Sequence, residues 1–439
     1  MCGIAGIVDL ASENPRIDFN TLKSMSDVVY HRGPDSDGQW ISPSKKCGLA
    51  FRRLAIIDLS EAGNQPMTTL DGRYTIVFNG EIYNHQSIRQ ELSAKGYIYH
   101  SGTDTETILY GYIEYGKDIV QKLYGMWGFA IWDEEEKKLF AARDRIGIKP
   151  FYYSQQGSGI IFGSEIKSIL KHPSVSKEFN IDELPNYLNF TMSSSRESLF
   201  SGINKLPAAH YLVFDKGGIK TERYWSPLSA YNLYSELNQE EIGTELVRLL
   251  RQSIKDRMMS DVPFGVFLSG GIDSSLNVAL MSELMDRPVD TYTVGFKELE
   301  KYNELNYAHK ISDLYKTNHK EILIDDRDAL PILDELVWHE DEPNGDPVCI
   351  PLYFLSKLTR DSGTIVIQVG EGSDEEFVGY PWMLRDYKFY NSFWKPFASM
   401  PAFLRKGAYY AAKPALEKLS SYIPLEYLRR AAFGDEFYW

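Results

Sequence analysis

Cysteine is scarce in this sequence, and long hydrophobic runs are absent. The 439 residues include three cysteines, Cys2, Cys47 and Cys349. An odd number spread this widely forms neither a disulfide framework nor a Cys-x-x-Cys metal site, so we expect a reducing, cytoplasmic environment. No stretch reaches the roughly 18 uninterrupted apolar residues of a membrane helix, and the start MCGIAGIVDL lacks the basic region of a secretory signal. We therefore expect neither export nor membrane insertion.

Positive charge is also in short supply. The sequence has 47 Lys and Arg against 61 Asp and Glu, a formal net charge of −14. Such a surface repels a phosphate backbone or an anionic membrane, so we expect neither nucleic acid nor membrane as a partner. Hydrophobic residues at 43% and charged residues at 25% are typical of a folded globular chain. At roughly 150 residues per domain, the length predicts two or three domains.

Residues 1–215 are rich in short strand patterns. β-Branched and aromatic runs bounded by turn residues predict strands, and helical spacing occurs in two places, near residues 19–29 and 85–95. Together they predict a layered α+β domain over residues 1–215. The expected strands include residues 74–78, 138–142, 159–163 and 211–214.

The pattern changes after an expected linker at residues 216–238. From residue 239 onwards, long helical patterns alternate with single apolar strands. This order predicts a parallel α/β sheet within residues 239–439, with ligands at the carboxyl ends of its strands. The expected strands are residues 264–268, 291–294, 320–324 and 365–367, and the expected helices begin near residues 242, 274 and 304.

Cys2 is the first chemical candidate. If Met1 is removed, Cys2 carries a thiol and a free α-amine on one residue. The reference pKa of an α-amine, about 7.7 to 8.0, allows it to take the thiol proton directly or through one water. A small buried cysteine is the alternative interpretation.

Four short clusters mix glycine with fixed charges, at residues 31–35, 53–58, 79–84 and 101–104. An Arg pairs with an α-carboxylate, and Asp or Glu accepts hydrogen bonds from an α-ammonium group, so the clusters suit a small zwitterion. An Asn amide beside a Gly N–H, as in Asn79-Gly80, suits an oxyanion hole. Each cluster alone is also compatible with a turn or a surface ion pair, but their occurrence together with Cys2 favours a site.

A phosphate site is predicted at residues 268–275, Leu-Ser-Gly-Gly-Ile-Asp-Ser-Ser, between an apolar strand and a helix. Backbone N–H groups at a helix N-terminus bind phosphate, and Asp273 offers a hard oxygen ligand for Mg²⁺. No Lys follows the glycines, so this is not a Walker A loop. A second acidic motif, residues 369–376, also follows an apolar strand, and Asp374 in it is a metal candidate. The alternative interpretation is that these carboxylates only stabilise the helix, because negative charge at a helix N-terminus interacts favourably with the helix dipole.

These motifs together resemble the glutamine-hydrolysing asparagine synthetase family. MCGIAGI, HRGPD, RLAIID, NGEIYNH and ARDRIGIKPFYY resemble its N-terminal-nucleophile glutaminase domain, a class II glutamine amidotransferase. LSGGIDSS and EGSDE resemble its ATP-pyrophosphatase domain. The resemblance implies an α-β-β-α sandwich over residues 1–215 and a parallel α/β ATP-pyrophosphatase domain over residues 239–439.

The resemblance also implies roles for individual residues. Cys2 is the nucleophile, Asn79 and Gly80 donate to the oxyanion, and Glu371 is the acid that forms or holds the acyl-adenylate. Mg²⁺ is held by Asp273 and Asp374. Glutamine is bound by Arg53, Ile56, Ile57, Asn79, Gly80, Glu81 and Asp104. ATP is bound by Leu268, Ser269, Gly270, Gly271, Asp273, Ser274, Val294, Val369 and Gly370.

The implied reaction is that of a ligase. Glutamine supplies ammonia, and the adenylated side chain of aspartate is converted to asparagine with release of AMP and pyrophosphate. Three alternatives stay open: amidation of a sugar acid, amidation of a peptide, and a non-catalytic scaffold of the same fold. The segment Glu342–Pro347 does not settle the acceptor. A homodimer is a further open expectation.

The sequence departs from the family pattern near its end. No match occurs to the family's Arg-x-Pro-Phe-Leu-Asp segment or to the Lys that follows it, so we expect a C-terminally truncated chain with an incomplete synthetase domain. Such a chain is predicted to hydrolyse glutamine and bind ATP-Mg, yet to form acyl-AMP at least about a hundredfold more slowly than an extended one. Residues 380–439, aromatic and interrupted by proline, are expected to form short helices that pack on the α/β core rather than bind nucleic acid.

Overall fold

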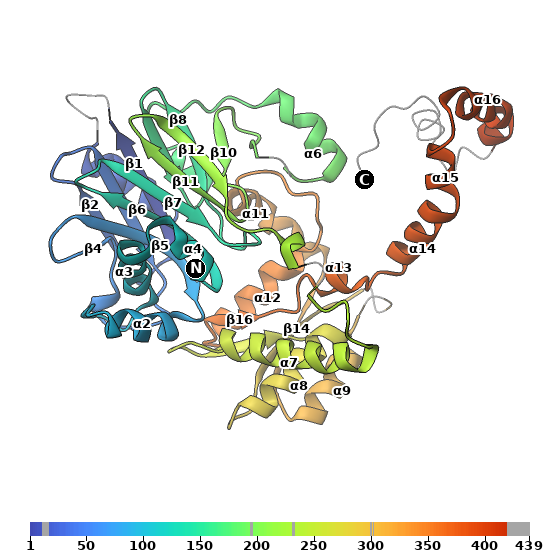
Figure 1. Cartoon of the computed structure of the whole chain (residues 1–439). Coiled ribbons are helices and arrows are strands. Elements are labelled where there is room, and N and C mark those ends of the chain that lie inside the picture. The colour runs from blue at the N-terminus through green and yellow to red at the C-terminus, as the bar shows by residue number, and fades with distance from the viewer. Residues whose placement is uncertain (11–16, 194–195, 231–232, 299–300, 302, 419–439) are drawn as a thin grey trace. The chain divides into compact units, whose positions relative to one another are not determined.

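The structure is a computed structural model that describes residues 1–10, 17–193, 196–230, 233–298, 301 and 303–418 (Figure 1). The chain forms two compact units, Met1–Val369 and Gly370–Trp439. No helix among these described residues has both the length and the apolar character needed to cross a membrane.

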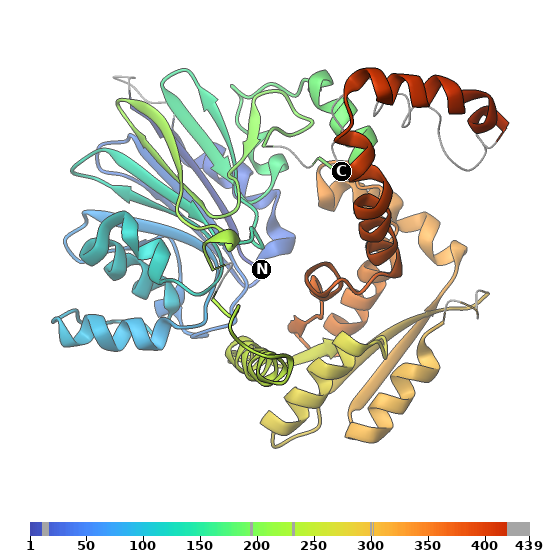
Figure 2. The ribbon, with the colours of Figure 1, turned by 45° about the vertical axis from the view of Figure 1, so that its right-hand side comes forward.

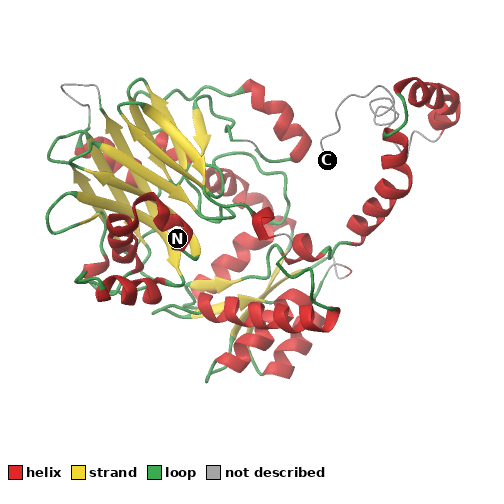
Figure 3. Ribbon diagram, in the orientation of Figure 1, coloured by secondary structure: helices red, strands yellow, loops and turns green. Residues whose placement is uncertain are grey.

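Two six-stranded antiparallel sheets build the first part of the larger unit (Figure 3). Buried side chains of both sheets, including Phe51 and Phe162 from one and Val77 and Trp132 from the other, form one shared core. The first sheet has the order β10(Ile203–Lys205), β8(Tyr152–Gln156), β9(Gly159–Gly163), β1(Gly3–Asp9), β3(Cys47–Arg53), β2(Ser36–Ile41). The second has the order β12(Gly218–Arg223), β11(His210–Asp215), β7(Lys138–Arg143), β6(Gly125–Asp133), β5(Tyr74–Ile82), β4(Met67–Thr68).

Helices cover the outer faces of this sandwich. Leu22 and Met25 of α1(Phe19–Asp27) and Ile166 of α5(Ile166–Ile169) pack on the first sheet. Apolar side chains of α2(His85–Ala94), α3(Asp104–Tyr115) and α4(Ile119–Lys122) pack on the second. The layers are therefore α-β-β-α, which confirms the predicted α+β fold.

Among the elements that the sequence did not predict, one helix and one strand have identifiable causes. Helix α3 was not expected, because its first turn, residues 104–107, is polar in sequence yet buried in the structure, so no apolar stripe alternates with an exposed polar face there. Strand β12 lies inside the range expected as a linker, residues 216–238, and it pairs with β11 along its whole length. The sheet therefore continues past residue 215. The expected division into two domains and a linker stays a prediction.

A four-stranded parallel sheet follows, as the sequence predicts. Its order is β15(Asn318–Ile324), β14(Asp290–Phe296), β13(Phe264–Phe267), β16(Val366–Gln368). Helices α7(Gln239–Arg257), α8(Ile272–Leu284) and α9(Leu305–Tyr315) cover one face, and α12(Cys349–Asp361) lies on the other (Figure 2). Shorter helices are α6(Leu184–Phe190), α10(Asp326–Ala329) and α11(Leu333–Glu340).

The smaller unit consists of helices in its described part. They are α13(Ser373–Phe377), α14(Pro381–Phe389), a π-helical segment η8(Tyr390–Trp394), α15(Lys395–Ala398) and α16(Ala402–Lys418). The rings of Phe389, Phe393 and Phe397 stack on one another along these helices. Pro414 lies inside α16, so the expectation that it interrupts the helix is wrong. The expected packing of these rings on the α/β core stays a prediction.

Candidate active sites

The first site is a cavity of about 60 Å³ at the ends of β1, β3 and β5. All eight residues that the sequence assigned to glutamine hydrolysis line it: Cys2, Arg53, Ile56, Ile57, Asn79, Gly80, Glu81 and Asp104. Gln65 and Lys149, to which the sequence analysis assigned no role, also line it, as does Thr103 of the cluster at residues 101–104. The assignment of the eight predicted residues to a bound substrate stays a prediction, but the structure brings these eight residues together from four distant segments.

Cys2 lies directly before β1, and backbone groups hold it. Its Sγ accepts a hydrogen bond from the Leu54 N–H at 3.5 Å and donates to the Leu54 carbonyl at 3.6 Å. Nε of Arg32 donates to the Cys2 carbonyl at 3.0 Å. Burial raises the pKa of the Cys2 thiol. A buried thiol of this kind needs a base to become a nucleophile.

The N-terminal amine lies in the same cavity as the thiol. Burial lowers the pKa of the Met1 α-amine to about 5, so this amine is neutral near pH 7. A neutral amine can accept a proton. The Met1 thioether accepts a hydrogen bond from Nζ of Lys149 at 3.2 Å, so Met1 itself occupies part of the cavity. An α-amine on Cys2 requires removal of Met1, which stays a prediction.

Asn79 is the clearest sign that the cavity takes a ligand. Its side chain is 1% exposed, and both the Nδ2 and the Oδ1 atom are buried without a hydrogen-bond partner among the described residues. An unpaired buried amide costs about 1–3 kcal/mol, so native proteins rarely retain one without a purpose. The adjacent Gly80 must lack a side chain, because a Cβ there would lie 2.2 Å from the Met126 carbonyl oxygen. A donor beside Cys2 is therefore ready for a ligand oxygen.

Arg53 ends β3 and organises one wall of the cavity. Its NH1 group donates to the Ser60 carbonyl at 2.7 Å and to Oδ1 of Asn64 at 3.0 Å, and its NH2 group contacts the Asp58 carbonyl. The side chain is buried. The guanidinium group therefore fixes the loop that follows Ile56 and Ile57 while its charge remains at the cavity.

Two buried carboxylates form the opposite wall. Oδ2 of Asp104, in the first turn of α3, accepts a hydrogen bond from the Ile82 N–H at 2.9 Å. Burial, together with the charge of Glu81, raises the pKa of Asp104 to about 7. Burial also raises the pKa of Glu81, which Lys149 opposes. In both cases burial is the largest cause of the shift, so a cationic ligand group beside these acids would favour their charged forms.

The second site is the loop between β13 and α8. Gly270 has φ +83°, and a Cβ there would lie 2.4 Å from Cβ of Tyr307. The first bond of α8 runs from the Ser275 N–H to the Gly271 carbonyl at 3.0 Å. The N–H groups of the three preceding residues therefore have no acceptor within the helix.

The remaining predicted nucleotide contacts lie around this loop. The hydroxyls of Ser269 and Ser274 are 3.0 Å apart, and the Leu268 N–H donates to the Tyr292 carbonyl at 2.8 Å. Val294 lies on β14, the strand that pairs with β13. The structure thus gathers these residues at the carboxyl end of a parallel sheet: Leu268, Ser269, Gly270, Gly271, Asp273, Ser274 and Val294.

The acidic motif is divided between the two units. Val369 ends the larger unit after β16, and Gly370, Glu371 and Asp374 belong to the smaller one. Gly372 has φ +86° and precedes α13. The Asp374 carboxylate lies where a Cβ on Gly379 would be, 1.8 Å from its Oδ1. The predicted roles of these residues toward ATP and Mg²⁺ stay predictions.

The fold and the cavity define a class of protein, a glutamine amidotransferase domain joined to a parallel α/β domain. Comparison with protein families agrees, since residues 1–225 match the glutamine amidotransferase domain and residues 245–435 match asparagine synthase. The chain belongs to the glutamine-hydrolysing asparagine synthetase family.

Individual relatives support this membership. The chain is 37% identical over 409 residues to a putative asparagine synthetase 2 of Methanocaldococcus jannaschii. The aligned region covers 88% of this chain and 77% of that relative. It is 35% identical over 404 residues to asparagine synthetase 3 of Bacillus subtilis, covering 87% of this chain and 64% of that protein. It is 30% identical over 403 residues to the amidase chry2 of Gibberella zeae, covering 87% and 59%. The chain thus spans less than two thirds of the Bacillus relative.

Proposed function

We propose that the protein is an ATP-dependent amidotransferase that hydrolyses glutamine and uses the ammonia to amidate the side-chain carboxylate of aspartate. The products are asparagine, AMP and pyrophosphate. The observation that carries this proposal is the unpartnered amide of Asn79 in the cavity that also holds Cys2. An oxygen that gains negative charge during acyl transfer is the partner that such a donor lacks.

The glutaminase half follows from the cavity walls. The Cys2 thiolate attacks the side-chain amide of glutamine, and Nδ2 of Asn79 with the Gly80 N–H stabilises the tetrahedral intermediate. Arg53 pairs with the α-carboxylate, Glu81 and Asp104 accept from the α-ammonium group, and backbone groups of Ile56 and Ile57 complete the contacts.

The nucleotide half rests on the loop after β13. The N–H groups at the start of α8 and the close approach enforced at Gly270 suit the phosphates of ATP. Asp273, in the first turn of α8, suits Mg²⁺. The resemblance to the family implies Asp374 as a second ligand and Glu371 at the acyl-adenylate. When bound, ATP supplies the leaving group that makes a carboxylate reactive toward ammonia.

A route for ammonia is supported by a second cavity of about 710 Å³ in the larger unit. Leu54, Ala55 and Leu59 line one side of it, and Phe267 and Ile367 of the parallel sheet line the other. Leu54 also holds the Cys2 sulfur, so this cavity adjoins the cysteine. The apolar side chains of its lining leave ammonia few groups to exchange protons with, although His31, Asp35 and Arg360 also line this cavity.

The carboxylate acceptor has a second candidate. Amidation of a sugar acid or a peptide, left open by the sequence, is the alternative to aspartate, and one relative with 30% identity is not named an asparagine synthetase but an amidase. The three free cysteines are consistent with the cytoplasm as the compartment, and a homodimer stays open.

Replacement of the nucleophile tests the proposal. Cys2→Ala is expected to abolish ammonia release from glutamine and to leave any synthesis from ammonium salts intact. Cys349→Ala, a half-buried cysteine on α12, is the matched control and keeps full glutaminase activity. Unchanged glutaminase activity in Cys2→Ala would remove Cys2 from the mechanism.

The nucleotide half and the acceptor need a separate assay. Pyrophosphate release is followed with aspartate, sugar acids or peptides as acceptors. Asp273→Asn keeps the side-chain size and removes the charge for Mg²⁺, so pyrophosphate release falls steeply while glutaminase activity stays. Release with another carboxylate and none with aspartate would reassign the acceptor.

A further inference from the structure

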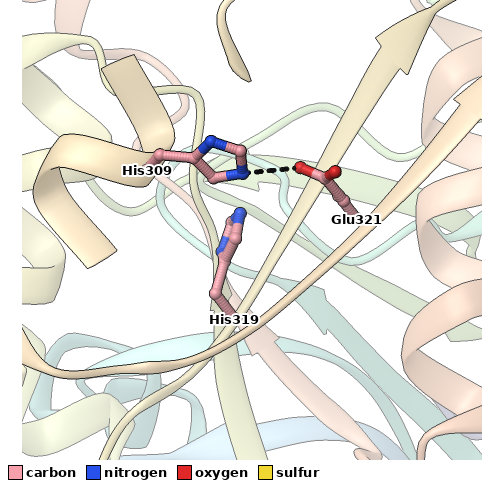
Figure 4. Close-up of side chains that lie close together, drawn as sticks. All are labelled: His309, His319 and Glu321. Atoms are coloured by element: carbon pink, nitrogen blue, oxygen red, sulfur yellow. Dashed lines mark hydrogen bonds and ion pairs between the residues drawn. The ribbon is translucent and has the colours of Figure 1, made fainter. Parts of the chain in front are cut away.

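Two histidines and a glutamate lie close together outside the two sites described above (Figure 4). His309 lies on α9, and His319 and Glu321 lie two residues apart on the edge strand β15. Alternate residues of a strand point to the same face, so His319 and Glu321 both face α9. One ligand atom from each of the three side chains lies within 4.8 Å of the others.

The three side chains meet in a geometry close to a metal site. Nε2 of His309 is 2.9 Å from Oε2 of Glu321, and the two imidazole rings meet edge to face with centroids 5.6 Å apart. Ligand atoms around a tetrahedral ion with bonds of about 2.0–2.2 Å lie roughly 3.3 Å from one another. His309 and Glu321 are 49% and 38% exposed, so small rotations of these side chains bring all three atoms to one ion.

His319 is held in the orientation that a metal ligand needs. Its Nδ1 is hydrogen-bonded to Oγ1 of Thr291 at 3.0 Å, and Thr291 is fully buried and also bonded to Thr317. Its Nε2 is buried and has no partner among the described residues. Proteins commonly fix a metal-binding imidazole through its other nitrogen, as Thr291 does here. A buried nitrogen without a partner is otherwise unfavourable.

We propose that His309, His319 and Glu321 bind one divalent transition-metal ion of the Zn²⁺ class through two imidazole nitrogens and one carboxylate oxygen. Two imidazole donors favour Zn²⁺ over Mg²⁺, which prefers oxygen ligands, so this site differs from the Mg²⁺ site proposed at Asp273. Three protein ligands leave a fourth position for water. The ion joins α9 to the edge strand of the sheet.

The proposed metal site is also close in sequence to residues that contact the candidate phosphate-binding loop, residues 268–275. A Cβ on Gly270 would lie 2.5 Å from the Tyr307 carbonyl carbon and 2.6 Å from the Ala308 nitrogen. His309 follows these two residues directly, so an ion on His309 restrains the part of α9 that packs against the loop.

Metal titration tests the site without ATP, Mg²⁺ or any substrate, so its result is independent of the proposed function. The chelator-treated chain is titrated with Co²⁺. We expect one equivalent of Co²⁺ to bind and to give the visible absorption bands of an ion with low coordination number. We expect Zn²⁺ to displace the Co²⁺ and to raise the melting temperature of the protein. His309→Ala and Glu321→Gln each weaken binding by about tenfold or more. His100→Ala, an exposed histidine elsewhere, leaves binding unchanged.

Folding and competing thiols are controlled separately. The melting temperature of each metal-free variant reports an intact fold, and this control needs no substrate. Cys2→Ala is expected to bind Co²⁺ as the unaltered chain does. The proposal would be overturned if Co²⁺ did not bind stoichiometrically or if a sulfur-to-metal charge-transfer band were present. It would also be overturned if both His309→Ala and Glu321→Gln bound Co²⁺ with unchanged affinity.

Discussion

The carboxylate of Asp261 accepts a hydrogen bond from the Asp58 N–H at 2.8 Å, and the Asp261 N–H donates to the Ile56 carbonyl at 2.9 Å. Ile56 lines the Cys2 cavity, whereas Asp261 lies three residues before β13, whose far end leads into the candidate phosphate-binding loop, residues 268–275. A single residue thus joins the wall of one site to the strand that supports the other.

Asp261→Ala is expected to loosen this wall. The Asp58 N–H loses its acceptor, and one hydrogen bond is worth about 1 kcal/mol, or roughly fivefold in an equilibrium. We therefore expect the KM for glutamine to rise about fivefold with kcat little changed, as measured by ammonia release. Asp261→Asn retains an acceptor oxygen and stays near the original KM. An equal KM for glutamine in Asp261→Ala and in the unaltered chain would show that the contact between Asp261 and Asp58 does not support the site.

Two asparagines of one motif are expected to respond in opposite ways. Asn79 has no hydrogen-bond partner among the described residues, so Asn79→Ala is expected to lower kcat for glutamine hydrolysis about 10²- to 10³-fold with little change in stability. Asn84 donates to the Lys122 carbonyl and accepts from the Tyr124 N–H, both at 2.9 Å. Asn84→Ala therefore lowers the free energy of unfolding by about 2 kcal/mol and leaves kcat unchanged.

Kinetics and denaturant unfolding of both variants distinguish these effects. A loss of stability in Asn79→Ala as large as that in Asn84→Ala would mean that the Asn79 amide is a structural element. Full activity of Asn79→Ala would exclude its role as an oxyanion donor.

The fold was predictable where local pattern and packing agree. The strands of the parallel sheet and the loop at Gly270 follow from short apolar runs, glycines and a helix start that are contiguous in the sequence. The cavity residues could be predicted because their motifs are specific, although only the tertiary structure brings four separate segments together.

Other features could not be predicted, for identifiable reasons. The first turn of helix α3 is polar in sequence yet buried, so the helix lacks the usual pattern of apolar buried and polar exposed residues. Thr103 and Glu106 nevertheless mark its start, since Oγ1 of Thr103 accepts from the Glu106 N–H. Lys149 is 5% exposed in the Cys2 cavity, and no local pattern predicts the burial of a lysine. His309 and His319 approach each other only through the packing of α9 on β15.

The pKa of Asp104, raised to about 7 by burial, predicts a pH dependence of stability. The unfolded side chain has a pKa of about 3.9. Between these values the folded state holds a proton that the unfolded state has lost, so this group lowers stability as pH rises from about 4 to 7. Asp104→Asn removes the effect and can still accept from the Ile82 N–H. Its melting temperature should exceed that of the unaltered chain at pH 8 and match it near pH 4.

The same substitution separates stability from binding. If Asp104 accepts the α-ammonium group of glutamine, Asp104→Asn raises the KM for glutamine at pH 8 even though the protein is more stable. A variant with lower stability at pH 8 than the unaltered chain would show that Asp104 is charged and satisfied in the folded state.

Two adjacent glycines of the phosphate loop are expected to differ in their tolerance of a methyl group. At Gly270 a Cβ would lie 2.4 Å from Cβ of Tyr307 and 2.5 Å from its carbonyl carbon, and the backbone has φ +83°, which L-residues rarely adopt. At Gly271 the nearest atom is Oγ of Ser269 at 3.2 Å, a side chain that can rotate. Gly270→Ala must therefore move the loop away from α9, whereas Gly271→Ala need not.

If the loop binds ATP as proposed, we expect Gly270→Ala to weaken ATP binding by about tenfold or more. The N–H groups proposed to bind the phosphates move with the loop, and each lost hydrogen bond costs about 1 kcal/mol. Gly271→Ala is expected to bind ATP more tightly than Gly270→Ala does. Glutaminase activity stays intact in both, since neither glycine lines the Cys2 cavity. Isothermal titration with ATP and Mg²⁺ measures the affinities. Equal affinities for the two variants would show that the contact with Tyr307 does not set the shape of the loop.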